Sequence, residues 1–158
     1  LIVRRDEPAL DVQALVGRTV CFTEELSSTG YVMPRKYLRN HGLDPDTDFV
    51  THWSGNHEQV LRDLLAGTCD LGATFSMNYQ TADQREIPAA QLRILAITGS
   101  SRHDAVVAGP SADPAITAAL RRALLGFDPT RDIGTPRAGD TERITGFVVP
   151  PADFLDPP

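Results

Sequence analysis

The sequence predicts an α/β domain built around a mostly parallel β-sheet. Up to residue 98, short apolar segments alternate with segments whose apolar residues recur at helical spacing. Strands separated by helices favour parallel pairing, because a crossover helix returns the chain to the same end of the sheet. With 158 residues, of which 41% are hydrophobic, the chain is long enough to bury the core of one such domain.

The predicted strands are rich in apolar residues and are bounded by turn residues. They cover residues 1–5, 18–23, 49–53, 70–75 and 92–98, with a further short strand over residues 105–108. Because the first strand begins at Leu1, we expect the sequence to start within a longer protein.

The predicted helices have apolar residues on one face and end at glycine or begin at a capping residue. They cover residues 11–16, 30–41, 57–66 and 113–125. Asp113 followed by Pro114 is typical of a helix N-cap and first helical position. Residues 76–91 and 127–158 show no clear pattern, although residues 141–149 suggest some order.

Charge and cysteine spacing exclude several classes of function. The net charge of −6 and the lack of a basic run argue against nucleic-acid binding. No apolar run reaches the roughly 20 residues of a membrane span. We expect no metal site and no cofactor, since neither cysteine lies in a CxxC pair. Cys21 ends one predicted strand and Cys69 begins another, so we expect two buried thiols too far apart for a disulfide.

The segment Ser27-Ser28-Thr29-Gly30 lies between a predicted strand and a predicted helix. A helix start leaves about four backbone N–H groups without partners and carries partial positive charge. Three hydroxyls there, followed by a glycine that allows close approach, favour binding of a tetrahedral oxyanion. The alternative is an ordinary N-cap by one hydroxyl, with the other two in solvent.

Polar residues also follow the other predicted strands. They lie at Ser54 to His57, at Thr74 to Asn78, and at Asp104 with its neighbours Arg102 and His103. In a parallel sheet, ligands bind at the carboxyl ends of the strands, so this topology predicts one ligand-binding rim. The alternative for His57 is an exposed residue at a helix start.

Several of these segments, in this order, resemble the phosphate, phosphite and phosphonate solute-binding proteins of ABC transporters. The resemblance rests on four short segments and covers about residues 1 to 126, and residues 146–150 are similar to the C-terminal segment of the family. The four segments are Leu26-Ser27-Ser28-Thr29-Gly30-Tyr31 with Pro34, Ser54-Gly55-Asn56-His57-Glu58, Asp70-Leu71-Gly72-Ala73-Thr74 and Ser101-Arg102-His103-Asp104-Ala105. They are preceded, in the order of the family, by Leu15-Val16-Gly17-Arg18-Thr19-Val20.

The resemblance implies a three-layer αβα lobe of a two-lobed, type II periplasmic-binding-protein fold. Residues 1–109 would form the ligand-binding lobe, with hinge strands over residues 1–5 and 104–109 lying side by side. Residues 110–158 would hold a C-terminal helix and an irregular tail that returns to a first lobe absent from this sequence. The implied function is extracytoplasmic binding of phosphonate, phosphite or phosphate, without catalysis, by a protein that delivers its ligand to a membrane permease.

The resemblance also assigns residues to the site. Ser27, Ser28, Thr29 and Gly30 would hold the oxyanion, and His57 would donate a hydrogen bond to it. Asp104 matches an acidic residue that faces the ammonium group of aminophosphonates. Further candidates are Asn56, Thr74 and Ser76. Since residues 74–78 lack the carboxylate common in the family, we expect a ligand without a cationic tail.

Two other functions fit parts of the pattern. The same fold could be a ligand-sensing module of a signalling receptor or kinase. A serine hydrolase could use Ser27 or Ser28 as nucleophile, His57 as base and Asp104 as the orienting acid. No G-x-S-x-G elbow surrounds either serine, which argues against the hydrolase.

Overall fold

The computed structural model describes residues 1–101, 104–132, 134, 146–151 and 154. The chain divides into two compact units, residues 1–102 and residues 103–158. This division concerns compactness, and the predicted division after residue 109 stays a prediction. The roles expected for the two parts, a ligand-binding lobe and a returning tail, remain predictions.

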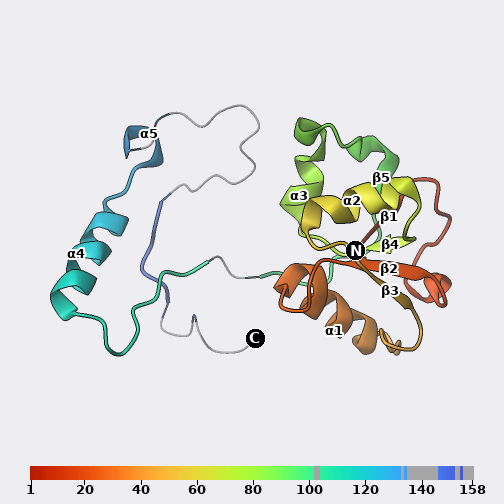
Figure 1. Ribbon diagram of the computed structural model, residues 1–158, viewed down its shortest axis with the longest axis horizontal. Coiled ribbons are helices and arrows are strands. Elements are labelled where there is room, and N and C mark those ends of the chain that lie inside the picture. Colours follow the sequence, from red (N-terminus) through yellow and green to blue (C-terminus); the bar gives the residue numbers. More distant parts are fainter. Residues whose placement is uncertain (102–103, 133, 135–145, 152–153, 155–158) are drawn as a thin grey trace. The chain divides into compact units, whose positions relative to one another are not determined.

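The first unit is organised around a five-stranded sheet in the order β3-β2-β4-β1-β5 (Figure 1). The strands are β1 (Ile2–Arg4), β2 (Thr19–Phe22), β3 (Val50–Trp53), β4 (Leu71–Gly72) and β5 (Leu92–Ile94). β2 pairs in parallel with β3 and β4, whereas β1 runs antiparallel to β4 and β5. Four of these five strands therefore run in the same direction and β1 runs in the opposite one, so the α/β class with a mostly parallel sheet is confirmed.

Helices cover both faces of this sheet, with α1 on one side and α2 and α3 on the other (Figure 1). The elements with helical turns are η1 (Gln13–Leu15), η2 (Ser28–Val32), α1 (Met33–Asn40), α2 (His57–Ala66), α3 (Ser76–Gln80), η3 (Ala82–Arg85) and η4 (Ala89–Gln91). The predicted helix over residues 57–66 has the bounds of α2, which begins after the N-cap Asn56 and ends at Gly67 in the left-handed conformation. The helix expected over residues 11–16 is only the short 3₁₀ turn η1.

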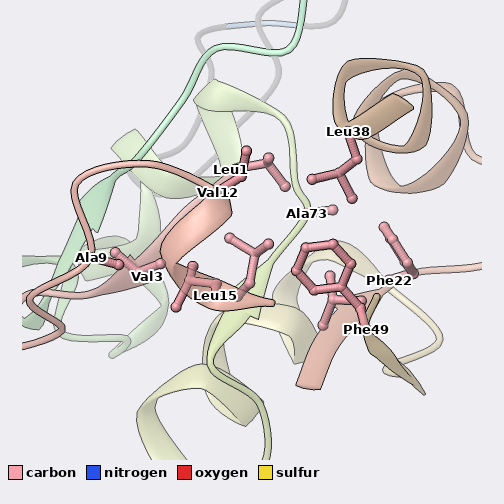
Figure 2. Close-up of a cluster of buried hydrophobic side chains, with 11 residues drawn as sticks. Leu1, Val3, Ala9, Val12, Leu15, Phe22, Leu38, Phe49 and Ala73 are labelled. Carbon is pink, nitrogen blue, oxygen red and sulfur yellow. The ribbon is translucent and has the colours of Figure 1, made fainter. Parts of the chain in front are cut away.

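The strands divide their side chains between two hydrophobic cores, because successive residues of a strand point to opposite faces. Val20 and Phe22 of β2 belong to the core beneath α1, together with Leu38 of that helix (Figure 2). Cys21, between them, belongs to the core beneath α2, with Leu61. The helices on the two faces and the sheet between them form the three-layer αβα arrangement, with one core on each side of the sheet.

The second unit contains the helices α4 (Pro114–Leu125) and α5 (Pro129–Asp132). The carboxylate of Asp113 accepts hydrogen bonds from the backbone N–H groups of Ala115 and Ile116, at 2.7 and 3.1 Å. The helix predicted from the Asp113-Pro114 pair is confirmed. Of the segment that suggested order, residues 141–145 lie outside the described residues.

The expectation of two free cysteines is wrong. Cys21 and Cys69 form a disulfide, with their Cα atoms 5.8 Å apart. The prediction assumed strands long enough to hold their ends apart. In the structure β2 has four residues and β4 has two, and the two strands are neighbours in the sheet. Cys69, just before β4, is therefore close to Cys21.

The strand expected over residues 105–108 is also wrong, since these residues belong to no strand. It was expected to lie beside β1, but β1 already pairs with β4 on one side and β5 on the other. No edge of β1 is left for a third partner. The hinge role of this segment remains a prediction.

Within the described residues, no helix is both long enough and apolar enough to cross a membrane.

Candidate functional site

The hydroxyl-rich segment after β2 forms the start of a continuous helical segment. Ser27 is the N-cap of the π-helical turn η2, which leads directly into α1. The Ser27 hydroxyl oxygen accepts a hydrogen bond from the Gly30 N–H at 3.0 Å, and the Ser27 carbonyl accepts from the N–H groups of Tyr31 and Val32, both at 3.0 Å. Ser27 therefore satisfies the donors deeper in the turn.

The first two residues of the turn keep their donors free. In the part of the chain that the structure describes, neither the backbone N–H groups nor the hydroxyls of Ser28 and Thr29 have a hydrogen-bond partner. Ser28 is exposed and Thr29 is half-buried, so these groups are open to a ligand. Two N–H groups and two hydroxyls at the positive end of a helical segment can hold an anion.

Gly30 is required by the packing beneath the turn. A Cβ atom at this position would lie 2.1 Å from the hydroxyl oxygen and 2.7 Å from the methyl carbon of Thr23. The side chain of Thr23 is buried. The glycine was predicted to allow close approach to a ligand, but what it demonstrably allows is the close approach of the turn to the end of β2.

A cavity of about 260 Å³ lies beside this turn, within the first unit. Its lining includes Thr29 at the start of the turn, Thr74 after β4, and Ser76 at the start of α3. Apolar side chains, among them Phe75 and Met33, form part of the wall, and the segment from Ala96 to Ser101, which includes the polar residues Thr98, Ser100 and Ser101, forms another part. Two of the predicted strand ends thus meet at one cavity, and none of its lining residues among those described is acidic.

His57 is joined to this cavity through its neighbours. It is the first residue of α2, and its Nδ1 atom lies 3.1 Å from the Thr74 hydroxyl oxygen. Its ring packs edge-on against Phe75, with the ring centres 4.7 Å apart. Burial lowers the pKa of His57 below the usual 6.5, while the negative charge of Glu24 raises it by a smaller amount. A neutral imidazole donates from one nitrogen and accepts at the other.

Asn78 and Arg85 are linked to His57 by hydrogen bonds. Asn78 lies at the end of the polar stretch predicted for the rim but was not assigned a role, and Arg85 was not selected. Asn78 is buried, and its side-chain nitrogen donates to the Thr74 hydroxyl at 3.0 Å and to the His57 carbonyl at 2.8 Å. Its side-chain oxygen accepts from Arg85 at 2.8 Å. The spacing of Thr74 and Asn78, four residues apart on the strand-to-helix connection, was the one available signal.

Two residues at the junction between β3 and α2 have structural partners. The Asn56 side-chain oxygen caps α2 by accepting from the Gln59 N–H at 2.8 Å. The Ser54 hydroxyl donates to the buried carboxylate of Asp63 at 2.6 Å. The suggested ligand role of Asn56 therefore rests on its amide nitrogen alone.

The remaining predicted site residues lie near the division of the chain. Asp104 is exposed and belongs to the second unit, so its role toward a ligand remains a prediction. Arg102 and His103 lie outside the described residues. The proposed contact of His57 with the same anion as Ser28 and Thr29 also remains a prediction.

One group of potential metal ligands occurs among the described residues. Atoms of Cys21, His52 and Asp63 lie within 4.8 Å of one another. The sulfur of Cys21 is bonded to Cys69 and so cannot act as a thiolate. His52 instead pairs with Asp63 at 3.3 Å, and the cluster supports the packing of β3 on α2.

Comparison with known proteins decides which family these features belong to. A family model described as "ABC transporter, phosphonate, periplasmic substrate-binding protein" matches residues 1–153. The chain belongs to this family. The resemblance seen in the hydroxyl triplet and the segments after it is thereby confirmed, and so is the fold class. The family consists of solute-binding proteins and is periplasmic. None of the curated proteins compared with the chain matches it.

Solved structures of other proteins share the fold of this chain. The protein XAC2383 from Xanthomonas citri, bound to chloride ion, is 23% identical with a TM-score of 0.59, covering 89% of this chain and 53% of its own. PhnD1 from Prochlorococcus marinus (MIT 9301), in complex with methylphosphonate, is 18% identical with a TM-score of 0.51, covering 58% of this chain and 37% of its own. At these identities the likeness concerns the fold. The chain spans about half or less of the length of these structures.

Proposed function

We propose that this chain binds phosphonate, phosphite or phosphate outside the cytoplasm, as part of the solute-binding protein of an ABC transporter and without catalysis. The observation that carries the proposal is the set of free donors at Ser28 and Thr29. Their position at the start of a helical segment, beside a cavity that Thr74 also lines, suits a tetrahedral anion.

The cavity further supports a ligand without a positive charge. Its described lining contains no carboxylate, and Phe75 and Met33 contribute apolar surface. An ammonium group placed there would lose water without gaining an anionic partner, which is unfavourable. Inorganic oxyanions and small alkyl phosphonates therefore fit better than aminoalkyl phosphonates.

The arrangement of His57 argues against the hydrolase. A serine hydrolase of this kind places a carboxylate on Nδ1 of its histidine, so that the ring is oriented and the imidazolium is stabilised. Here the Thr74 hydroxyl occupies that position. Hydroxyl, imidazole and N–H groups without that carboxylate are suited to holding an anion.

Titration calorimetry of phosphate, phosphite and methylphosphonate into the purified chain tests the proposal. We expect weak binding, because an anion on one open lobe faces water, where attraction at ~4 Å falls toward 1 kcal/mol. Replacing both Ser28 and Thr29 with alanine should weaken it by roughly 1.5–3 kcal/mol, the range for hydrogen bonds to charged groups.

A matched control removes two exposed hydroxyls elsewhere, in the double variant Thr47→Ala with Thr68→Ala. Neither residue lines the cavity, so this variant should bind as the parent does. Binding that is unchanged in the Ser28 and Thr29 variant, or no binding of any of the three anions by the parent, would refute the proposal.

A further inference from the structure

A chain of hydrogen bonds runs from Arg85 through Asn78 and Thr74 to His57. We propose that this relay fixes the His57 imidazole as the tautomer with its proton on Nε2, so that Nε2 donates to the bound oxyanion. The tautomer follows from the contacts described below, and the donation to an anion rests on the proposed function. Thr74, Asn78 and Arg85 are then positioning residues, and Thr74 is not a ligand contact through its hydroxyl.

The direction of the relay is set at Arg85. A guanidinium group has only donors, so the Asn78 atom that faces it must be the carbonyl oxygen. Arg85 also donates to the Asn78 backbone carbonyl at 2.6 Å, and its Nε lies 3.4 Å from a carboxylate oxygen of Glu58. These contacts hold the guanidinium in place and leave the Asn78 amide nitrogen facing the opposite way.

The amide nitrogen of Asn78 then determines the role of the Thr74 hydroxyl. One N–H of Asn78 donates to the His57 carbonyl, and the other donates to the Thr74 hydroxyl oxygen. A hydroxyl that accepts a hydrogen bond still has one proton to donate. In the described part of the chain, the one acceptor within reach of that proton is His57 Nδ1, at 3.1 Å.

A ring that accepts at Nδ1 carries its single proton on Nε2. That nitrogen has no partner among the described residues, so its N–H is left for a ligand. Among the described residues, the charged group that acts on the ring is Glu24, whereas the neighbouring Glu58 is paired with Arg62 and Arg85. Burial lowers the pKa of His57 and so favours the neutral ring that the relay requires.

The tautomer can be measured directly by long-range ¹H–¹⁵N NMR correlation of the histidine rings. The chain contains four histidines, and His57→Gln identifies the relevant signals. At about pH 8, where imidazole is neutral, we expect Nε2 to be protonated and Nδ1 to be unprotonated, with shifts of one tautomer. A protonated Nδ1 in the parent chain would overturn the proposal.

Variants at Thr74 and Asn78 test the relay itself. Thr74→Val removes the hydroxyl with little change of shape, so the ring should show averaged shifts of both tautomers, and Thr74→Ser should restore the single tautomer. Asn78→Asp replaces the donor with an acceptor, so the Thr74 proton should turn toward residue 78 and the His57 proton should move to Nδ1. Nitrogen shifts in Thr74→Val equal to those of the parent would contradict the relay.

Addition of phosphate separates this inference from the proposed function. Phosphate should shift the Nε2 signal of the parent and shift it less in Thr74→Val. A fixed tautomer whose signals do not respond to phosphate would leave the relay intact and refute the anion contact of His57. A response to phosphate together with a proton on Nδ1 would support the anion contact of His57 and refute the relay.

Discussion

Cleavage of the disulfide should remove a large part of the stability of the first unit. Cys21 and Cys69 are separated by 48 residues in sequence, and both lie in the core beneath α2. The bond therefore links β2 to the segment that leads into β4. Reduction restores the conformational freedom of this long loop in the unfolded chain, while it leaves every side-chain atom of the folded core in place.

The size of the effect follows from the loop length. The chain-entropy relation gives a loss of roughly 14 cal/mol/K for a closed loop of this length, or about 4 kcal/mol at 25 °C. Domains typically unfold at a cost of about 5–15 kcal/mol, so the bond contributes a substantial share. The double variant Cys21→Ala with Cys69→Ala should lose more than the reduced parent, because it also removes two buried sulfur atoms.

Urea unfolding monitored by tryptophan fluorescence measures the difference. The chain has one tryptophan, Trp53 at the end of β3, which packs with Phe22 and Tyr31 of the same unit. Its signal therefore reports the unit that holds the bond. The free energy of unfolding should be compared for the oxidised parent, the parent kept in dithiothreitol, and the double alanine variant.

Two results would refute this reasoning. The first is an unfolding midpoint that is the same in the oxidised and the reduced parent, which would mean that the bond contributes nothing. The second is detection of two free thiols per chain in the unfolded, non-reduced protein. A thiol count of zero together with a lower midpoint after reduction is the expected outcome.

Two further predictions concern the turn and the histidine. Gly30→Ala should lower the free energy of unfolding by about 1–3 kcal/mol, the range for overpacking, because rotation of Thr23 only exchanges its oxygen for its methyl group against the new Cβ. Thr23→Ala in the same chain should restore part of the loss, because the Ser27 hydroxyl oxygen still lies 2.8 Å from the new Cβ. Urea unfolding that shows no rescue at all would count against the clash with Thr23. Because the pKa of His57 is lowered by burial, the unfolded state binds more protons below pH 6.5, and the stability from the neutral ring should fall as the pH drops below this value. Urea midpoints at several pH values should show a shallower decline in His57→Gln, and equal declines would argue that His57 is not desolvated.

The sequence was most informative where local chemistry decides the structure. The end of α2 at Gly67 and the start of α4 after Asp113 follow from capping residues, and the start of α2 at His57 follows from the apolar spacing of its helix. The strand positions follow from short apolar runs between turn residues. The hydroxyl triplet could be placed before a helix for the same reason, since its neighbours on both sides have clear patterns.

Features that depend on contacts distant in sequence could not be predicted in this way. The disulfide requires the lengths of β2 and β4 and the fact that they are neighbours in the sheet. The absence of a strand over residues 105–108 depends on both edges of β1 being occupied. The relay joins residues from α2, α3, η3 and the connection between β4 and α3, and it forms when these elements are packed together.

The two interpretations of the hydroxyl triplet are compatible, because Ser27 is the N-cap and the proposed anion site uses Ser28 and Thr29. Ser27 acts as an ordinary N-cap: its hydroxyl oxygen accepts from Gly30, and its carbonyl accepts from the next two N–H groups. An N-cap serves the donors in the interior of the first turn, so the donors of Ser28 and Thr29 are left over. Substitution of Ser27 should therefore act mainly on the stability of the turn, whereas substitution of Ser28 and Thr29 should act mainly on anion binding. The capped start of this helical segment therefore leaves the N–H groups and hydroxyls of Ser28 and Thr29 available to a ligand.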